Sequence, residues 1–573
     1  MILQALNEYY ERKAALPDSG IAPYGLEWKE IPFIIVLDSD GNPINIESTY
    51  EGEGKKRRAK RFLVPHSIKR SSGIASNLLW DNPEYALGIS EKGDAKRHNE
   101  FVRRVCELDE KRIPEITALK KFLMRDNKKA LLENLPSCAE TLKQMLEKGG
   151  NVSFRIARAD SIIPEMPTVH AVAQADAKSD DAVDGLCLVS GIRGKIARMH
   201  TAIKGVWGAQ PSGGNIVSFN QPSFCSHEKF GKQGENAPVG EKAEFAYTTA
   251  LNQLLRKDSA QRLQVGDAST VFWAAKDTAF EGGFAALFNL PPKDDPDANL
   301  HAIEAFLTSV QTGVFSTPQA RETNFYVLGL SPNVSRISIR FWFAQTVAVM
   351  AENIARHFND IKITHGPKEK DALPLFRLLV STAANSKSEN IPPNLAGETM
   401  RAILEGLPYP QTLLQAAINR IRAEHEINYP RAALIKACIN RSARYKNPSA
   451  EEELKVSLDK ENRSAGYLLG RLFAALEKIQ EEANGSATIR ERFYGAASGT
   501  PIVVFGNLMR LKNHHLAKLS DGRRIQFEKL LGEIHAGVDA NGYPTHLPLA
   551  DQGRFAIGYY HQKQDFYTKK EDK

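Results

Sequence analysis

The sequence predicts an α+β protein in which a mixed α/β N-terminal region precedes an all-α C-terminal helical bundle. Strand patterns alternate with helical patterns over roughly the first 370 residues, and from about residue 372 the strand patterns fade. A chain of 573 residues is also too long for one hydrophobic core. We therefore expect a mixed α/β domain at 1–370, a helical connecting segment at 371–446 and a bundle of four to five helices at 447–573.

The N-terminal elements follow from the spacing of apolar residues. Residues 2–15 carry apolar side chains on one helical face, which predicts an amphipathic helix. Residues 31–37 and 44–50 read as two strands, and Asp40-Gly41 between them is typical of a hairpin turn. The apolar run from Phe62 to Pro65 predicts a strand that ends at proline.

The remaining elements are predicted in the same way. In the mixed region we expect a helix opening at 72–79 and broken by Asn82-Pro83, helices over 95–148, a strand at 151–157, a loop at 171–184, a strand at 185–190, a helix at 241–256, a buried strand at 268–275, a helix at 300–310, and strands at 324–330 and 336–343. In the helical region we expect helices at 399–404, 411–423, 432–444, 465–481, 489–494, 501–519, 522–533 and 551–563.

Composition and charge are those of an ordinary globular protein with a mildly basic balance. The chain is 42% hydrophobic and 25% charged, with a formal net charge of +7, which is compatible with a polyanionic partner. Five cysteines lie far apart without a CxxC pair, which argues against disulfides and a zinc site and fits a reducing cytoplasm. The N-terminus lacks the apolar core of a signal peptide, and no window reaches the length of a transmembrane span.

The densest basic cluster of the chain lies between positions 55 and 70. It holds eight cations and no acid: Lys55, Lys56, Arg57, Arg58, Lys60, Arg61, Lys69 and Arg70. Small hydroxyl residues, Gly73 and the amide of Asn77 follow closely, and this combination is typical of a loop that contacts phosphates and reads bases. A solvated basic hairpin edge that discourages edge-to-edge pairing explains the cluster equally well.

A second region of interest runs over residues 192–240. It contains eight glycines, with cations and the aromatics Trp207, Phe219, Phe224 and Phe230 between them. Glycine permits close backbone approach to a ligand, cations meet phosphates, and aromatics stack on bases. The aromatics taken alone fit a packed core better than a stacking surface.

Signatures of catalysis are absent from the sequence. It has no phosphate-binding P-loop, no HExxH, no GxSxG and no ordered dinucleotide fingerprint. We therefore expect no enzyme activity, no cofactor and no metal site. Two other classes stay open: a metal-dependent nuclease with a dispersed carboxylate site, and a general RNA-binding scaffold.

Several long motifs closely resemble one family. They are MILQALNEYYER (1–12), KRFLVPHSIKRSSGIASNLLWDNPEYALGI (60–89), IKGVWGAQPSGGNIVSFN (203–220), GENAPVGEKAEFAYTTALN (234–252), ENRSAGYLLGRLFAALEKIQEEA (461–483) and DQGRFAIGYYHQKQDFYTKK (551–570). The chain resembles the large subunit of the type I-C CRISPR Cascade surveillance complex from its first residue to its last.

The resemblance implies a non-catalytic subunit of an RNA-guided DNA-recognition complex. Such a subunit recognises the protospacer-adjacent motif in duplex DNA, promotes strand opening and R-loop formation, and holds the displaced strand. The implied partners are CRISPR RNA, target double-stranded DNA, the displaced single strand, the backbone, handle-binding and small subunits of Cascade, and a recruited nuclease-helicase, with no membrane. The C-terminal bundle, in turn, resembles a Cascade small subunit.

We assign candidate contacts on this basis. For the motif we name Lys69, Arg70, Ser71, Ser72 and Asn77, with Lys60 and Arg61 on phosphates. The second region adds Lys204, Gln210, Ser212, Asn215, Asn220, Lys229, Lys232 and Gln233, and its loop at 210–215 is a candidate strand-separating wedge. For the displaced strand on the helical region we name Arg441, Arg444, Arg471, Lys512, Arg523 and Arg524.

Overall fold

The computed structural model describes residues 1–17, 19–52, 57–68, 70, 73–89, 95–176, 183–226, 229, 232–288, 298–449, 451–539 and 542–568. The chain forms two compact units. The N-terminal unit comprises Met1–Ile203 and Asn215–Gln253, and the C-terminal unit comprises Lys204–Gly214 and Leu254–Lys573. The expected mixture of helices and strands, an α+β fold, is confirmed. The expected boundaries near 370 and 446 stay a prediction.

The N-terminal unit is built on a four-stranded sheet in the order β3-β2-β8-β7. Its strands are β2 (Phe33–Leu37), β3 (Pro43–Ser48), β7 (Trp80–Asp81) and β8 (Val152–Ile156). β2 is buried along its whole length, and it pairs antiparallel with β3 and parallel with β8. Asp38 accepts the backbone N–H groups of Asp40 (2.9 Å) and Asn42 (2.7 Å), which closes the turn. The predicted hairpin is confirmed.

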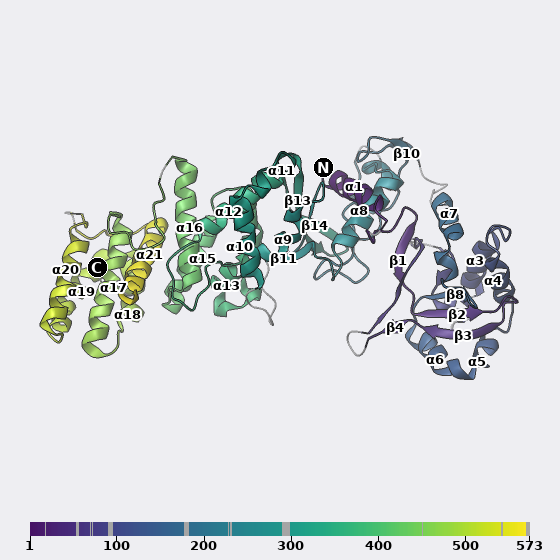
Figure 1. Ribbon diagram of the computed structural model, residues 1–573, viewed down its shortest axis with the longest axis horizontal. Coiled ribbons are helices and arrows are strands. Elements are labelled where there is room, and N and C mark those ends of the chain that lie inside the picture. The colour runs from purple at the N-terminus through teal and green to yellow at the C-terminus, as the bar shows by residue number, and fades with distance from the viewer. Residues whose placement is uncertain are drawn as a thin grey trace. The chain divides into compact units, whose positions relative to one another are not determined.

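Helices form most of the rest of this unit, and the first and the last of them pack against each other apart from the sheet (Figure 1). They are α1 (Ile2–Ala14), α2 (Pro83–Ala86), α3 (Ala95–Cys106), α4 (Glu115–Leu123), α5 (Lys128–Glu133), α6 (Ala139–Lys148), α7 (Pro167–Asp176) and α8 (Glu241–Leu254). Phe101, Phe122 and Phe154 bury their rings together where α3 and α4 meet β8. The periodicity that predicted helices at 2–15, 95–148 and 241–256 is thus explained by burial of one face of each helix.

Short two-stranded ribbons complete the N-terminal unit. β1 (Leu26–Glu30) pairs antiparallel with β6 (Arg61–Pro65), β4 (Tyr50–Glu51) with β5 (Arg58–Ala59), and β9 (Asp184–Leu186) with β10 (Arg193–Lys195). The predicted strand ending at Pro65 is therefore confirmed as β6.

Four local predictions are wrong. Residues 73–79 form no helix, because Leu79 has a positive φ of 66° and side chains bond the backbone of this loop. Asn82-Pro83 starts a helix instead of breaking one, since the Asn82 side chain caps α2 by accepting the Tyr85 N–H at 3.1 Å. Residues 167–176, partly expected as loop, form α7, and the strand expected at 185–190 is only β9, because the chain turns after Leu186.

The C-terminal unit begins with an antiparallel sheet and continues as helices. The sheet has the order β11-β12-β13-β14, formed by β11 (Arg262–Val265), β12 (Ala268–Ala274), β13 (Asn324–Asn333) and β14 (Arg336–Thr346). The helices are α9 (Ala279–Phe288), α10 (Ala298–Gln311), α11 (Pro318–Glu322), α12 (Val347–Asp360), α13 (Leu375–Ser381), α14 (Pro393–Leu404), α15 (Gln411–Glu424), α16 (Tyr429–Lys446), α17 (Ala465–Asn484), α18 (Ile489–Gly499), α19 (Pro501–Leu516), α20 (Asp521–His535) and α21 (Leu549–Tyr567). In the described part of the chain no strand follows β14, as the fading strand pattern predicted.

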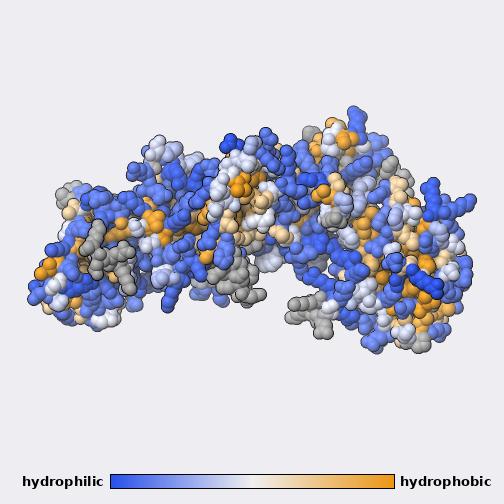
Figure 2. Space-filling view, in the orientation of Figure 1, coloured by the Kyte–Doolittle hydropathy of each residue, from blue (hydrophilic) through white to orange (hydrophobic). Residues whose placement is uncertain are grey.

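The surface of the described chain is largely polar. In the view of Figure 2 hydrophilic residues dominate, and hydrophobic residues form scattered patches. Among the described residues, none of the helices combines the length and the apolar character that crossing a membrane requires.

Glycine brings two helices of the C-terminal bundle into backbone contact. A Cβ atom added at Gly470 of α17 would overlap the carbonyl oxygen of Phe555 on α21, and one at Gly558 of α21 would overlap the carbonyl oxygen of Tyr467. The two helices therefore approach more closely than larger residues allow, and the neighbouring aromatic side chains fill the remaining core.

Gly470→Ala should destabilise the C-terminal unit by about 1–3 kcal/mol, because the methyl group would overpack the contact between α17 and α21. Gly506→Ala is the matched control, since Gly506 lies on α19 with open space around its Cβ position. That change should stabilise the helix by about 0.5–1 kcal/mol. Urea unfolding followed by circular dichroism measures both, and equal effects of the two substitutions would contradict the packing described.

Candidate nucleic-acid interface

Exposed cations lie on the ribbons of the N-terminal unit. Arg57, Arg58 and Lys60 are exposed at and beside β5. The guanidinium of Arg57 lies 4.5 Å from the ring centroid of Tyr50, and the Lys60 ammonium lies 5.4 Å from that of Phe62. These aromatic contacts orient the cations without neutralising them. Lys55 and Lys56 of the same cluster lie outside the described residues.

The two predicted phosphate contacts differ in their surroundings. Lys60 makes no ion pair with a described residue, so its charge remains available to a ligand. Arg61 is half-buried, and its guanidinium donates to the carbonyl oxygen of Trp28 at 3.3 Å. Of the two, Lys60 fits a phosphate contact better.

A buried carboxylate organises the loop that follows β6. Asp81 accepts the guanidinium N–H of Arg70 and, at 2.9 Å, the backbone N–H of Asn77. Arg70 also donates to the carbonyl of Ala75 at 2.7 Å and lies 4.0 Å over the ring of Tyr85. The Arg70 guanidinium therefore holds the loop closed through contacts inside the protein. These contacts would have to be given up before Arg70 could bind the DNA motif as predicted.

Asn77 is not placed to read a base. Its side chain oxygen accepts the backbone N–H of Ile68 at 3.0 Å, and the residue is only 6% exposed. The expected contact of Asn77 with the motif is wrong, because its buried amide is already bonded to the backbone of the loop. The other expected readers, Lys69, Ser71 and Ser72, lie outside the described residues.

A cavity of about 430 Å³ lies beside this loop. Its lining includes Pro65, His66 and Ile68 from the first basic stretch and Arg198 and Thr201 from the glycine-rich region, together with Tyr24, Arg104, Glu241, Glu244 and Phe245. The fold therefore brings the basic stretch and the start of the glycine-rich region to one place, which their separation in sequence does not reveal.

Charges of both signs shape this cavity. The carboxylate of Glu244 accepts the backbone N–H of Thr201, and this bond holds the wall formed by residues 197–201. Burial raises the pKa of Tyr24 to about 12, with the negative charges of Glu241 and Glu244 acting in the same direction. Tyr24 is therefore a neutral hydroxyl at physiological pH, able to donate or accept a hydrogen bond.

The predicted residues at 215–233 are mostly engaged inside the N-terminal unit. Asn215 donates to the carbonyl of His200 at 2.7 Å, and Lys229 donates to that of Glu235 at 2.8 Å. Lys232 is exposed and pairs loosely with Glu235 at 3.7 Å. Asn220 is exposed, and Gln233 is half-buried with a side chain oxygen that no described residue bonds.

The loop 204–214 of the C-terminal unit presents an exposed tryptophan. Trp207 is 64% exposed, yet its backbone N–H donates to the buried hydroxyl of Ser269 at 2.8 Å. Gly205 has a φ of 84°, and a Cβ there would lie 2.7 Å from the carbonyl oxygen of Leu255. The backbone is therefore anchored while the indole faces solvent. Lys204, Gln210 and Ser212 are also exposed on this loop.

The packed-core interpretation of the aromatics is wrong for Trp207 and also for Phe224, which is 44% exposed. Apolar spacing could not separate these residues from core aromatics. The surrounding glycines could have indicated that these aromatics are exposed. Glycine lets the backbone of a loop pack directly against the rest of the protein, and the side chains of the loop then face solvent.

Two of the cations predicted on the helical region are structural. Arg441 is 2% exposed, pairs with Asp360 at 2.9 Å and donates to the carbonyl oxygens of Ala402 and Leu407. Arg471 is 1% exposed and pairs with Glu533 at 2.7 Å. Neither can reach a DNA strand, so their expected role is wrong. The sequence could not reveal this, because their acidic partners lie far away along the chain.

The other four cations of this set are reachable, but described partners engage them. Arg444 pairs with Asp360 (2.7 Å), Arg523 with Glu482 (2.6 Å) and Arg524 with Asp521 (2.9 Å), and Lys512 donates to Asn513 (3.1 Å). Ion pairs at the surface contribute little to stability, so Arg523 and Arg524 remain candidates for contact with a strand. Lys512 and the partly exposed Arg444 remain candidates as well, although Asp360, the partner of Arg444, is buried.

The described residues contain no group of three His, Cys, Asp or Glu side chains that could hold a metal ion.

Over residues 6–567 the chain matches a class of CRISPR-associated proteins. It belongs to the family described as CRISPR-associated protein (Cas_Csd1), which is the large-subunit family of type I-C Cascade. The resemblance seen in the motifs is confirmed, and the chain is a subunit of a Cascade effector complex. A search of curated proteins found no match.

Asn77→Ala should destabilise the loop after β6, because the substitution removes the side-chain oxygen that accepts the Ile68 N–H. The expected cost is about 1–3 kcal/mol. Faster hydrogen–deuterium exchange in peptides covering 66–82 would show it. The exposed Asn134→Ala serves as control and should change stability by less than about 0.5 kcal/mol. Unchanged exchange in the Asn77 variant would contradict a structural role.

Proposed function

We propose that this chain recognises the protospacer-adjacent motif in duplex DNA within the Cascade complex, and that it does so without catalysing a reaction. The observation that supports the proposal most is the ribbon formed by β4 and β5 in the N-terminal unit, at and beside which Arg57, Arg58 and Lys60 are exposed. Exposed cations of this kind suit the phosphate contacts that position a protein on a duplex.

In this proposal the contacts divide between clamping and reading. Lys60 and its exposed neighbours hold phosphates, while base edges are read from the loop after β6. Lys69, Ser71 and Ser72 remain the proposed readers, and the cavity beside Pro65 and Thr201 adjoins the described part of the same loop. Arg70 contributes by keeping the loop closed through Asp81.

Strand opening is assigned to Trp207. An indole that is exposed on an anchored backbone can stack on a base that leaves its pair, and inserted apolar side chains promote unstacking in many DNA-bending proteins. This assignment moves the wedge from the expected 210–215 segment to the neighbouring tryptophan of the same loop.

Further proposed contacts follow from the family. CRISPR RNA, the displaced strand, the other Cascade subunits and a recruited nuclease-helicase are the proposed partners. On the C-terminal unit, Arg444, Lys512, Arg523 and Arg524 remain proposed contacts of the displaced strand, which is then held by charge and not by sequence.

Lys60→Ala should weaken binding of the assembled complex to duplexes with and without the motif by similar factors. It should also reduce the slope of log affinity against log salt by about 1, the loss of one phosphate contact. Lys111→Ala is the control, because Lys111 is an exposed lysine of the same unit away from the ribbon. Filter binding at several salt concentrations measures both. A loss confined to motif-containing DNA would show that Lys60 reads bases, which contradicts the division proposed here.

Trp207→Ala should reduce strand opening while leaving duplex binding nearly intact. Loss of one base–aromatic stack costs roughly 1–3 kcal/mol. Fluorescence of 2-aminopurine placed next to the motif reports the opening, and Trp207→Phe should retain most of it because a ring still stacks. Equal opening by the wild type and the alanine variant would overturn the assignment.

Cleavage of DNA by the purified chain with magnesium or manganese would overturn the proposal of a non-catalytic subunit.

A further inference from the structure

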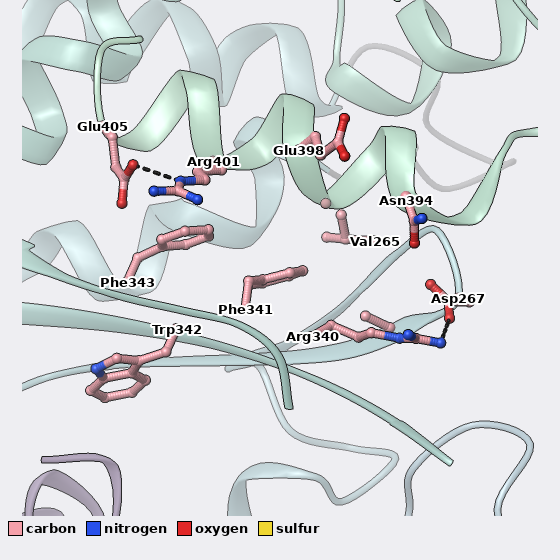
Figure 3. A pocket seen from close by; sticks show the side chains of 12 residues that line it. Val265, Asp267, Arg340, Phe341, Trp342, Phe343, Asn394, Glu398, Arg401 and Glu405 are labelled. Carbon is pink, nitrogen blue, oxygen red and sulfur yellow. Dashed lines mark hydrogen bonds and ion pairs between the residues drawn. The ribbon is translucent and has the colours of Figure 1, made fainter. Parts of the chain in front are cut away.

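A second cavity, of about 340 Å³, lies within the C-terminal unit between the sheet and α14 (Figure 3). Strand β14 contributes Arg340, Phe341 and Phe343, and α14 contributes Asn394, Glu398 and Arg401. A cavity of this size accepts one side chain or one base, but not a duplex.

Aromatic rings form the floor of this cavity. Phe341 and Phe343 stack with their centroids 5.1 Å apart and their planes within 11°. Both point from β14 toward α14, whereas Trp342 points to the opposite face of the sheet (Figure 3). A Cβ atom at Gly397 would lie 3.3 Å from the Phe341 ring, so the helix leaves space for this ring because it carries glycine there.

The charged groups around the floor leave one carboxylate without a partner. Arg340 pairs with Asp267 at 2.9 Å, and Arg401 pairs with Glu405 at 2.9 Å. Glu398 is exposed at the cavity and makes no ion pair with a described residue. The lining therefore carries two cations and three acids, and the excess charge is negative.

We propose that this cavity binds the arginine or lysine side chain of a partner protein in the Cascade complex. The ring of Phe341, with the buried ring of Phe343 stacked on it, receives the cation by a cation–π contact, and the Glu398 carboxylate pairs with it. Asn394 at the rim accepts a hydrogen bond from the same group or from the partner's backbone.

Charge complementarity favours a protein over a nucleic acid as the occupant. A nucleotide would bring its phosphate close to Asp267, Glu398 and Glu405, and these three carboxylates outnumber the two guanidinium groups of the lining. The inference depends on the chain being a subunit of a complex, and it is independent of the proposed motif contacts in the N-terminal unit.

Charge reversal tests the proposal in the full chain. Glu398→Lys should lower incorporation of the chain into the complex at least tenfold, and Glu398→Gln should fall between this variant and the wild type. Glu352→Lys is the control, since Glu352 is an exposed acid of α12 that does not line the cavity. Co-purification measures incorporation, and an unchanged circular dichroism spectrum and urea midpoint confirm folding. Normal incorporation of Glu398→Lys would overturn the proposal.

Photo-crosslinking identifies the occupant. With Asn394 replaced by p-benzoylphenylalanine, the assembled complex should yield a crosslink to a partner protein at or next to an arginine or lysine. A crosslink to CRISPR RNA or DNA, or no crosslink at all, would overturn the assignment. Binding of motif-containing duplex by the purified Glu398→Lys chain should match the wild type, so that a failure here is distinguishable from a failure of the DNA-recognition proposal.

Discussion

The buried carboxylate of Asp81 is the constraint on which the proposed DNA-contacting region depends. It binds the Arg70 guanidinium and the Asn77 N–H, and so closes the loop between β6 and α2. The indole N–H of Trp80 donates to the carbonyl of Pro65 at 2.9 Å and ties the end of this loop back to the ribbon. A buried charge needs such partners, so loss of Arg70 or of the Asn77 N–H contact would leave the Asp81 carboxylate poorly compensated.

The same electrostatic requirement divides the cations of the chain into two groups. In the C-terminal unit, Asp360 pairs with Arg441 and Arg444, and the buried Arg441 serves packing while Arg444 stays partly exposed. Burial lowers the pKa of the neighbouring His357 to about 3, with the Arg441 charge acting in the same direction, and the imidazole stays neutral beside this pair. In the N-terminal unit, Lys60 keeps its charge at the surface and makes no ion pair with a described residue, which is why we propose it as a phosphate contact. A net charge of +7 therefore says less about function than the placement of individual pairs.

Apolar periodicity predicted most helices and strands correctly, since one buried face imposes a period of 3.6 or 2 on any element. It failed at 73–79, where side chain bonds to the backbone replace a helix, and at Asn82-Pro83, where a cap looks like a break. It also failed to show that Trp207 is exposed, because the spacing of apolar residues does not distinguish a buried aromatic side chain from an exposed one in a glycine-rich loop. The motif-rich stretches nevertheless sufficed to recognise the family.

The sequence by itself was enough to predict most helices and strands, to show that the usual catalytic motifs are missing and to recognise the family. Each of these depends only on residues that are close together in the sequence. Only the tertiary structure decided which residues can meet a ligand. It buried Asn77, Arg441 and Arg471, exposed Trp207, and joined residues 65–68 to 197–201 around one cavity. The physical reason is that burial and charge pairing depend on partners far apart in the chain, as Arg441 and Asp360 are.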